Sequence, residues 1–313
     1  MAEEVIVGSL SQDLVVKTPR RPQKGETIRG TDFGMFAGGK GNNQALSAAR
    51  AGAKVAMVGR VGNDQFAGTL IDMLKKNNVD AEFVLRDPDV GTGIAVIIVD
   101  GDGDNSIVIA QQSNLKLCEA DVEKARATIE GSKILLMQLE VPVETDIAAA
   151  KVARQAGVVV ALNPAPAPSP EDGPLPVELL ANVDIFIPNQ TEAEQMCGVA
   201  VTDVASAREA AKKLRSFGPS SVIITMGEQG AFLQTNEVSE LIPTFPVKAI
   251  DTTAAGDAFC GALAAAIARG ESIHAAVRWG CAAGALATTK MGAEPSLPTA
   301  KEISNLVSSA ALA

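Results

Sequence analysis

The sequence is poor in aromatic residues, which make up 3% of its 313 residues and include one Trp and no Tyr. Because single-stranded nucleic acids are held largely by stacking on aromatic side chains, this composition argues against a nucleic-acid surface. A formal net charge of −10 also disfavours nucleic acids and anionic membranes as partners. A small anionic ligand remains possible, because the N-terminus of a helix can attract it locally.

Histidine is almost absent, since His274 is the only one in the chain. This excludes metal centres built from several histidines and catalytic groups that pair His with Ser or Cys. His274 follows Ser272 at an expected helix start, and we expect it at the surface. The chemistry of the protein must then depend on carboxylates, lysine, amides and the backbone.

The four cysteines are far apart and show neither CxxC nor metal-ligand spacing, which indicates a reducing compartment. The N-terminus, MAEEVIVGS, lacks the basic and apolar regions of a signal peptide. No apolar run approaches the roughly 20 residues of a membrane span. These features predict a cytoplasmic protein without a membrane partner. The cysteines are Cys118, Cys197, Cys260 and Cys281.

Apolar strands and helices alternate over most of the chain, and four successive strands end in a polar or glycine-bearing tip. Right-handed crossovers between parallel strands would bring these tips to one edge of a sheet. The pattern predicts one α/β domain over residues 1–313, with a doubly wound, mostly parallel sheet between two helical layers. A ligand crevice is expected at the edge. The tips are Glu140, Asn163, Asn189 and Gly227.

Two segments depart from this alternation. Residues 14–36 alternate loosely and contain several Pro and Gly, which favours short strands and turns over a helix. Within residues 91–110, a β-branched run over 93–99 and a tight turn lead into a second strand over 106–110, which predicts a hairpin. We expect the two segments to form a small second sheet.

The glycine-rich sequence GGKGNNQ, residues 38–44, leads into a helix expected over residues 45–51. With Gly34 it nearly matches GxxxxGK[ST], but Gly41 replaces the required Ser or Thr and no strong strand precedes it, so we expect no P-loop. A turn of this kind brings the backbone and nearby side chains close to a hydroxyl-rich or anionic ligand. A simple helix cap with a solvated lysine is the alternative. The candidate ligands are Gly39, Lys40 and Asn43.

The segment Asp251–Gly261 (DTTAAGDAFCG) runs from a polar turn through small residues into an alanine-rich helix expected over 258–269. The first turn of a helix presents free N–H groups and the positive end of the dipole. Asp257 could act there as a general base beside a bound anion. The alternative is a first-turn charge that only stabilises the helix. The small residues that leave this end open are Ala254, Ala255 and Gly256.

Several of these segments together resemble the signatures of the ribokinase-like, or PfkB, carbohydrate kinases. They occur in the order typical of that family and span nearly the whole chain. The resemblance implies ATP-dependent phosphorylation of a sugar's primary hydroxyl, with D-ribose as the first candidate and D-ribose 5-phosphate as product. It also implies that the small sheet is a lid and forms a homodimer. The segments are GGKGNN (38–43), MQLEV (137–141), LNPAPA (162–167), PNQTEAE (188–194), TMGEQG (225–230) and DTTAAGDAFCG (251–261).

The resemblance implies specific roles for individual residues. Asp257 would take the hydroxyl proton, and the N–H groups of residues 254–256 would form an anion hole for the phosphoryl group. The implied sugar ligands are Ser11, Asp13, Gly39, Lys40, Asn43 and Glu140. The implied nucleotide-binding residues are Asn189, Thr225, Gly227, Gly230, Gly256 and Cys281.

The same resemblance implies that the protein binds two ions. Glu192 would organise Mg²⁺ through water, although a capping box formed by Thr191 and Glu194 would leave Glu192 as a first-turn charge. A monovalent cation such as K⁺ would bind beside the anion hole, where a helix C-terminal turn is the alternative. The implied positions of that cation are Asp251, Thr253, Ala287, Lys290, Gly292 and Ser296.

Two places on the sugar side depart from the pattern of members that phosphorylate ribose. Ser11 stands where those members usually carry Asn, and residues 109–112 (IAQQ) replace a run of small residues. Another sugar or a nucleoside is therefore the alternative acceptor. A non-catalytic nucleotide or sugar sensor is the alternative of a different class. A dehydrogenase is disfavoured because no GxGxxG follows the first strand.

Overall fold

A nine-stranded sheet forms the centre of the computed structural model, which describes residues 2–169 and 171–309. Seven neighbouring strands run parallel, and an antiparallel pair lies at one margin, as expected for a doubly wound α/β fold. The order across the sheet is β13 (Ser239–Ile242), β12 (Ala231–Gln234), β11 (Ser221–Thr225), β10 (Ile185–Phe186), β9 (Val159–Asn163), β8 (Ile134–Gln138), β1 (Glu4–Val7), β4 (Val55–Gly62) and β5 (Asp80–Asp87).

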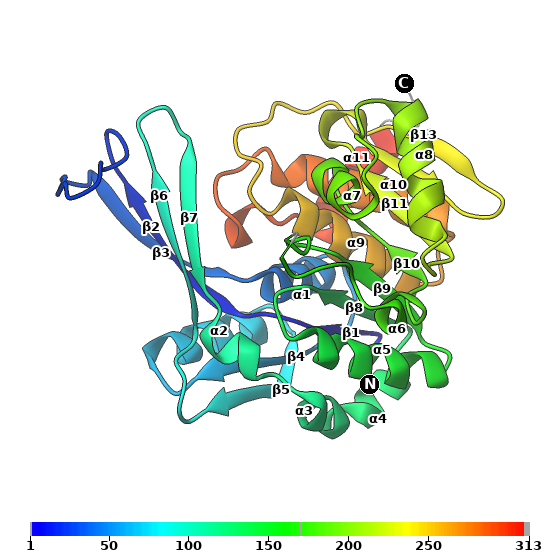
Figure 1. Ribbon diagram of the computed structural model, residues 1–313, viewed down its shortest axis with the longest axis horizontal. Helices are drawn as coiled ribbons and strands as arrows, with labels where there is room; N and C mark the ends of the chain where they lie inside the picture. The colour runs from blue at the N-terminus through cyan, green and yellow to red at the C-terminus, as the bar shows by residue number, and fades with distance from the viewer. Residues whose placement is uncertain (1, 170, 310–313) are drawn as a thin grey trace.

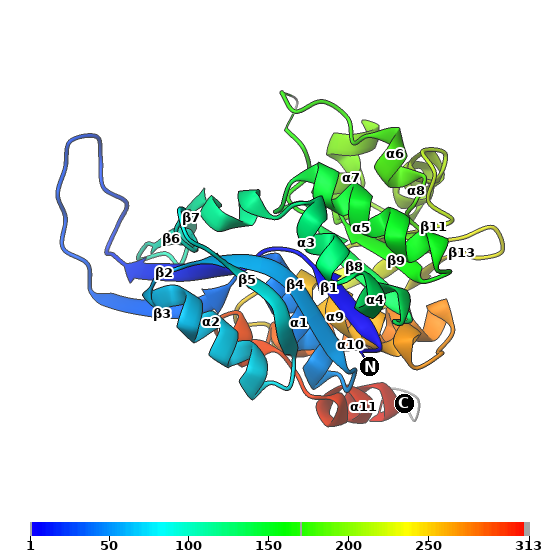
Figure 2. The same cartoon turned by 90° about the horizontal axis from the view of Figure 1, so that it is seen from below.

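Helices cover both faces of this sheet (Figure 2). Successive strand residues point to opposite faces, so Ile6 joins one apolar core while Val5 and Val7 join the other. The helices on the Ile6 face are α1 (Lys40–Arg50), α2 (Gln65–Lys76), α9 (Ala255–Ala268), α10 (Ile273–Ala287) and α11 (Ala300–Ser309). Those on the other face are α3 (Glu119–Lys124), α4 (Arg126–Glu130), α5 (Val143–Gln155), α6 (Val177–Leu180), α7 (Gln190–Cys197) and α8 (Val204–Arg215).

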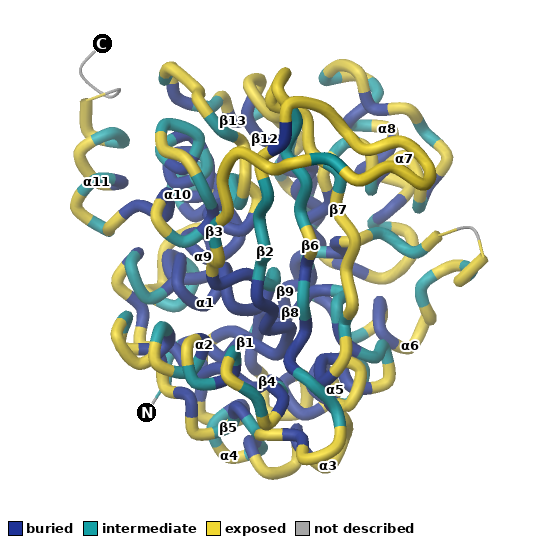
Figure 3. The backbone as a smooth tube through the Cα atoms, turned by 90° about the vertical axis from the view of Figure 1, so that its left-hand side faces the viewer, coloured by how far each residue is buried: buried dark blue, intermediate teal, exposed yellow. Residues whose placement is uncertain are grey.

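A second, four-stranded sheet stands beside the main body (Figure 1). Its last two strands form the predicted antiparallel hairpin. The sheet extends beyond the predicted segments because Ser11 is in register with both Gly38 and Gly93. Its strands are more exposed than β1 and β8 of the main sheet (Figure 3). The strand order is β3 (Asp32–Gly38), β2 (Ser11–Lys17), β6 (Gly93–Val99) and β7 (Asn105–Ala110).

The starts of two helices differ from the prediction. The helix expected from residue 45 begins at Lys40, and the helix expected from residue 258 begins at Ala255. Glycine and asparagine have low helix propensity, but tertiary packing overrides it, and residues 41–44 of the first turns of α1 are buried. The strand that precedes the glycine-rich turn is β3, which is mostly exposed. That strand belongs to the small sheet, whereas a P-loop would need one in the parallel sheet.

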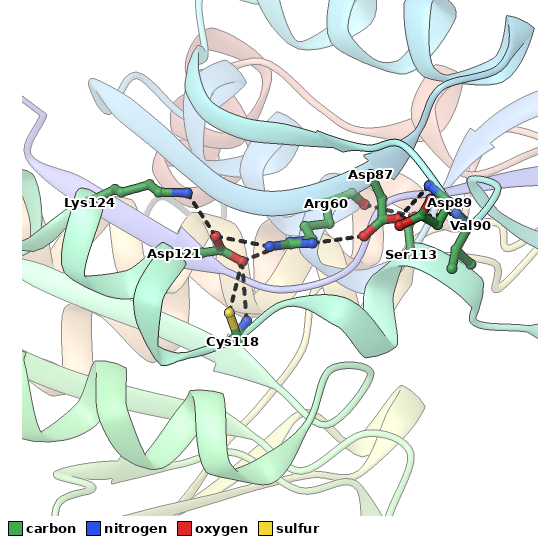
Figure 4. Close-up of polar contacts among 8 residues, drawn as sticks. All are labelled: Arg60, Asp87, Asp89, Val90, Ser113, Cys118, Asp121 and Lys124. Carbon is green, nitrogen blue, oxygen red and sulfur yellow. Dashed lines mark hydrogen bonds and ion pairs between the residues drawn. The ribbon is translucent and has the colours of Figure 1, made fainter.

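Arg60 of β4 ties both ends of the β6–β7 hairpin to the main sheet (Figure 4). Its guanidinium donates to Asp87 at 2.8 Å and to Asp121 at 2.7 Å. Asp87 also accepts the N–H groups of Asp89 and Val90, just before β6. Although burial raises the pKa of Asp121, hydrogen bonds led by Arg60 hold it below its ordinary value. The segments that enter and leave the hairpin are thus fixed by one largely buried cation.

The structure also places His274 and the four cysteines and shows the character of the helices. Ser272 caps α10, and His274 in its first turn is exposed. The four cysteines are free. Within residues 2–169 and 171–309, no helix has both the length and the apolar character needed to cross a membrane.

Two fully buried carboxyl groups lie away from the strand tips. Asp146 of α5 and Glu4 of β1 are 0% exposed, and none of their carboxyl oxygens has a hydrogen-bond partner within residues 2–169 and 171–309. Burial disfavours the ionised form and raises the pKa of both groups well above their ordinary values. The folded protein therefore holds these protons more tightly than the unfolded chain does.

This arrangement makes stability depend on pH. For a carboxyl with a raised folded-state pKa, stability is fully present below the unfolded pKa of about 4 and is lost as pH rises through the folded pKa. We expect Asp146→Asn to gain more than about 1 kcal/mol relative to the wild type between pH 5 and pH 8, since one pKa unit corresponds to about 1.4 kcal/mol. Urea unfolding at both pH values measures the change.

The matched control is Glu144→Gln, which removes an exposed carboxylate from the same helix. Its stability relative to the wild type should change little over this range. A difference between wild type and Asp146→Asn that is the same at pH 5 and pH 8 would contradict the interpretation.

Candidate functional site

The first turn of α1 lies against the chain that connects β1 to β2. A Cβ atom at Gly41 would lie 2.6 Å from the backbone nitrogen of Ser9, closer than real contacts allow. Gly39 caps α1 with a φ of 89°, a conformation that favours glycine. The glycines of the GGKG sequence therefore allow the helix N-terminus to approach the tip of β1.

Glu140, which follows β8, lies at this N-terminus. Its Oε2 accepts the backbone N–H of Lys40 at 2.9 Å and the hydroxyl of Ser9. A carboxylate is favoured there because the helix dipole places positive charge at the N-terminus. The predicted sugar ligands Lys40 and Glu140 are thus brought together.

Asp257 lies in the first turn of α9 and is 7% exposed. Asn43 donates from Nδ2 to Asp257 Oδ2 at 3.0 Å, and Gln44 donates from Nε2 to Asp257 Oδ1 at 3.0 Å. Asn43 was predicted to lie at the site, whereas Gln44 was not. Two consecutive residues of α1 therefore hold both oxygens of the candidate base.

Asp13 of β2 completes the acidic group. Gly38 makes room for it, because a Cβ there would lie 2.2 Å from Asp13 Oδ1. Burial, followed by the charges of Glu140 and Asp257, raises the pKa of Asp13 to about 7. Glu140 and Asp257 therefore lie close enough to Asp13 to disfavour its ionisation.

Lys40 is the cation among these carboxylates. Burial lowers the pKa of Lys40, whereas the negative charges of Asp257, Glu140 and Glu192 raise it. The charges have the larger combined effect, so the pKa lies above its ordinary value. Lys40 is therefore charged, and it partly balances the acidic residues around it.

The N-terminus of α9 is open, with one change from the prediction. Ala254 is the left-handed cap residue, and the N–H of Ala255 donates to the carbonyl of Thr252 at 3.2 Å. That N–H is therefore already bonded. Within the described part of the chain, the N–H groups of Ala254, Gly256 and Asp257 have no acceptor. A Cβ at Gly256 would point into open space, so an anion could approach these donors.

A cavity of about 640 Å³ lies beside this helix start. It contains most of the predicted nucleotide-binding residues, namely Thr225, Gly227, Gly230, Gly256 and Cys281, but not Asn189. Burial raises the pKa of the Cys281 thiol to about 12, so this side chain is uncharged where it lines the cavity. Several residues were not predicted because they are ordinary apolar or small residues in sequence. These are Phe245, Val247, Phe259, Gly284 and Thr288.

Asn189 and Glu192 form the capping box of α7. Asn189 Oδ1 accepts the N–H of Glu192, and Glu192 Oε2 accepts the N–H of Asn189, both at 2.8 Å. The alternative box between Thr191 and Glu194 is therefore wrong. Burial and the charge of Asp257 raise the pKa of Glu192 against the opposing effects of Asn189 and Lys40. The Glu192 carboxylate therefore lies close enough to Lys40 and Asp257 to interact with their charges.

Part of the predicted cation set is brought together at the turn before α9. Asp251 accepts the N–H and hydroxyl of Thr253 with Oδ1 and the N–H of Gly292 with Oδ2. The carbonyl of Ala287 accepts the N–H of Lys290 at 3.4 Å. Ser296 is fully buried, and its hydroxyl donates to Ala293. Asp251, Thr253 and Gly292 therefore form one hydrogen-bonded unit.

Ser11 is 5% exposed, and its hydroxyl accepts Nδ2 of Asn114 at 3.2 Å. Asn114 also pairs with both backbone groups of Leu10. Sequence reasoning did not identify Asn114, because it is 103 residues from Ser11. Ser11 keeps its own hydroxyl hydrogen as a donor.

Comparisons with known proteins show which family and which structures this chain is similar to. The pfkB family carbohydrate kinase model matches residues 1–300. The chain is 41% identical to a ribokinase of Haemophilus influenzae over 95% of both chains, and 43% identical to a mouse ribokinase over 84% of this chain and 81% of that one. The structure is similar to an Arabidopsis thaliana ribokinase complexed with ribose and ATP, with a TM-score of 0.90 and 32% identity over 98% of each chain.

The charge cluster predicts a measurable titration. We expect Asp13 to take up its proton near pH 7, and Glu140→Gln to lower that midpoint, because one neighbouring negative charge is removed. Carboxyl ¹³C NMR of the ligand-free protein measures it. Asp32→Asn, at the exposed far end of β3, is the control and should leave the midpoint unchanged. A midpoint near 4 in the wild type would rule out the proposed crowding of charges.

Proposed function

Because this chain belongs to the PfkB family of carbohydrate kinases, we propose that it transfers the terminal phosphoryl group of ATP to the primary 5-hydroxyl of D-ribose. One observation carries the proposal beyond the family. The nucleotide-side cavity and a second cavity of about 550 Å³ under the small sheet share Thr252, in the turn before α9. The second cavity contains Asp13. The two substrates would therefore meet at this turn, next to the helix start that carries Asp257.

The chemistry follows from the position of Asp257. Its carboxylate would accept the proton of the sugar hydroxyl as that oxygen attacks the phosphorus of the terminal phosphate. The free N–H groups of Gly256 and Asp257 would stabilise the charge of the transferred group. Phosphoryl transfer needs mainly alignment and charge neutralisation, so a site without histidine is sufficient.

The sugar would bind among the residues that α1, β2 and β8 bring together. Charged and amide oxygens can each accept hydroxyl hydrogen bonds, and Lys40 can donate them.

We expect sugar affinity to rise between pH 6 and pH 8, because only ionised Asp13 accepts two hydroxyl groups. The proposed sugar ligands are Ser11, Asp13, Gly39, Lys40, Asn43, Glu140 and Asp257.

The residues present fit Mg²⁺ brought with the nucleotide. Mg²⁺ usually keeps several waters and binds one or two carboxylates together with substrate phosphates. Glu192 uses one carboxylate oxygen in the capping box, which leaves the other to hold a Mg²⁺ water. Bound Mg²⁺ would neutralise phosphate charge.

We further propose a monovalent cation at the Asp251, Thr253 and Gly292 unit.

We infer that the small sheet, with its segments 14–36 and 91–110, is a lid that excludes water from the reaction. Its exposed apolar side chains would support a homodimer. They include Phe33, Met35, Val108 and Ile109, which are 52–71% exposed. A cytoplasmic location stays a prediction, consistent with four free cysteines.

The substrate is tested by ADP release across a panel of sugars and nucleosides, with and without K⁺. We expect the highest kcat/KM with ribose. Preference for another sugar or a nucleoside would revise only the acceptor, whereas no turnover with any acceptor would contradict the kinase assignment. Stimulation by K⁺ would support the cation site.

The base is tested by Asp257→Asn. We expect kcat to fall by about 10²–10⁴-fold, because general base catalysis contributes this much. ATP binding, measured by calorimetry, should stay close to that of the wild type. The control is Asp203→Asn, which alters another helix-start aspartate, the N-cap of α8. Near wild-type kcat in Asp257→Asn would falsify the assignment of the base.

A further inference from the structure

Resting on this proposed function, we propose that Gln44 and Gln138 are positioning residues that fix the orientation of the Asp257 carboxylate. Neither belongs to the sugar or nucleotide ligands proposed above. Both are 0% exposed, so they act on the reaction through Asp257.

Gln44 uses all of its amide groups. Its Nε2 donates to Asp257 Oδ1 at 3.0 Å and to Asn163 Oδ1 at 3.1 Å, and its Oε1 accepts Nε2 of Gln138 at 2.7 Å. Asn163 is oriented in turn, since its Nδ2 donates to the carbonyl of Ile187 at 2.8 Å. An amide has two donor hydrogens and one carbonyl oxygen, so Gln44 is fully satisfied.

These partners permit only one orientation of the Gln44 amide. If it rotated by half a turn, its oxygen would face the acceptor oxygens of Asp257 and Asn163, and its NH₂ group would face the donor of Gln138. Three attractive contacts would become repulsive or unsatisfied in a buried site, where such losses are largest. Gln138 is therefore the residue that keeps Gln44 donating to Asp257.

Gln138 is held in place at the end of β8. A Cβ at Gly8 would lie 2.1 Å from Gln138 Oε1, so the glycine at the tip of β1 is what leaves space for this side chain. Gln138 Oε1 has no hydrogen-bond partner among the described residues. An unpaired buried oxygen is unfavourable for stability, and its presence supports a role for Gln138 in the site.

The network distinguishes the two oxygens of the base. Oδ1 accepts Gln44, which is 0% exposed, whereas Oδ2 accepts Asn43, which is 7% exposed and is one of the proposed sugar ligands. We therefore assign proton transfer to Oδ2, with Oδ1 as the oxygen that anchors the carboxylate. Rotation of the carboxylate would move Oδ2 out of line with the attacking hydroxyl.

The test is Gln138→Met, which keeps an unbranched side chain of similar size and removes the donor to Gln44. We expect kcat to fall by about 10-fold or more, because small misplacements of a reacting group are costly. The KM for ATP should change by less than about 2-fold, because the nucleotide cavity is untouched. Gln138→Glu, which replaces the donor by an acceptor without changing the shape, should lower kcat at least as much.

The matched control is Gln234→Met, at a buried glutamine of β12 that bonds to Ser239 and Thr235, away from Asp257. It removes the hydrogen bonds of a buried glutamine in the same way and should leave kcat unchanged. Wild-type kcat in both Gln138 variants, or equal loss of kcat in the Gln234 control, would overturn the inference.

A second measurement does not depend on turnover. In the wild type, we expect the side-chain NH₂ protons of Gln44 to exchange slowly with solvent by NMR, and in Gln138→Met to exchange at least about 10-fold faster. Unchanged exchange would overturn the inference. A wild type without activity on any sugar would instead contradict the proposed function, while the exchange rates still decide the role of Gln138.

Discussion

The close crossing of α1 and α9 is the constraint on which the site depends. At Gly261, a Cβ atom would lie 2.5 Å from the backbone oxygen of Gln44, so the two helices can approach this closely only through glycine. Ser47 of α1 donates to the carbonyl of Ala258 at 3.0 Å and fixes the same crossing. The first turns of both helices then lie side by side. That contact lets residues of α1 hold the carboxylate of Asp257, more than 200 positions away in sequence.

The same crossing concentrates charge. Asp13, Glu140 and Asp257 come from three separate segments, and burial together with the charges of Glu140 and Asp257 raises the pKa of Asp13. Two features oppose this repulsion, namely the Lys40 ammonium and the N-termini of α1 and α9. A protein with a net charge of −10 can therefore still attract an anionic nucleotide at one point.

The small sheet is fixed firmly at one end and open at the other. Near the main body, Asp64 accepts the N–H and hydroxyl of Thr92, and Asn114 brackets the backbone of Leu10. The far ends of the strands lie in exposed turns. Because the bonded end carries Asp13 and the glycines beside it, the position of Asp13 is set where the small sheet joins the core.

The sequence predicted the parallel sheet, its polar strand tips and the place of Asp257 at a helix start, because each of these has a local pattern. The starts of α1 and α9 were misplaced; in α1 the low helix propensity of glycine and asparagine is overcome by burial of residues 41–44, which only the fold reveals. Gln44 and Asn114 were missed because their partners are about 100 to 200 residues away. Gln138 did carry a signal: it ends an otherwise apolar, fully buried strand. A polar side chain at such a position must find a buried partner, and the partner of the strand's last residue lies at the edge where ligands bind.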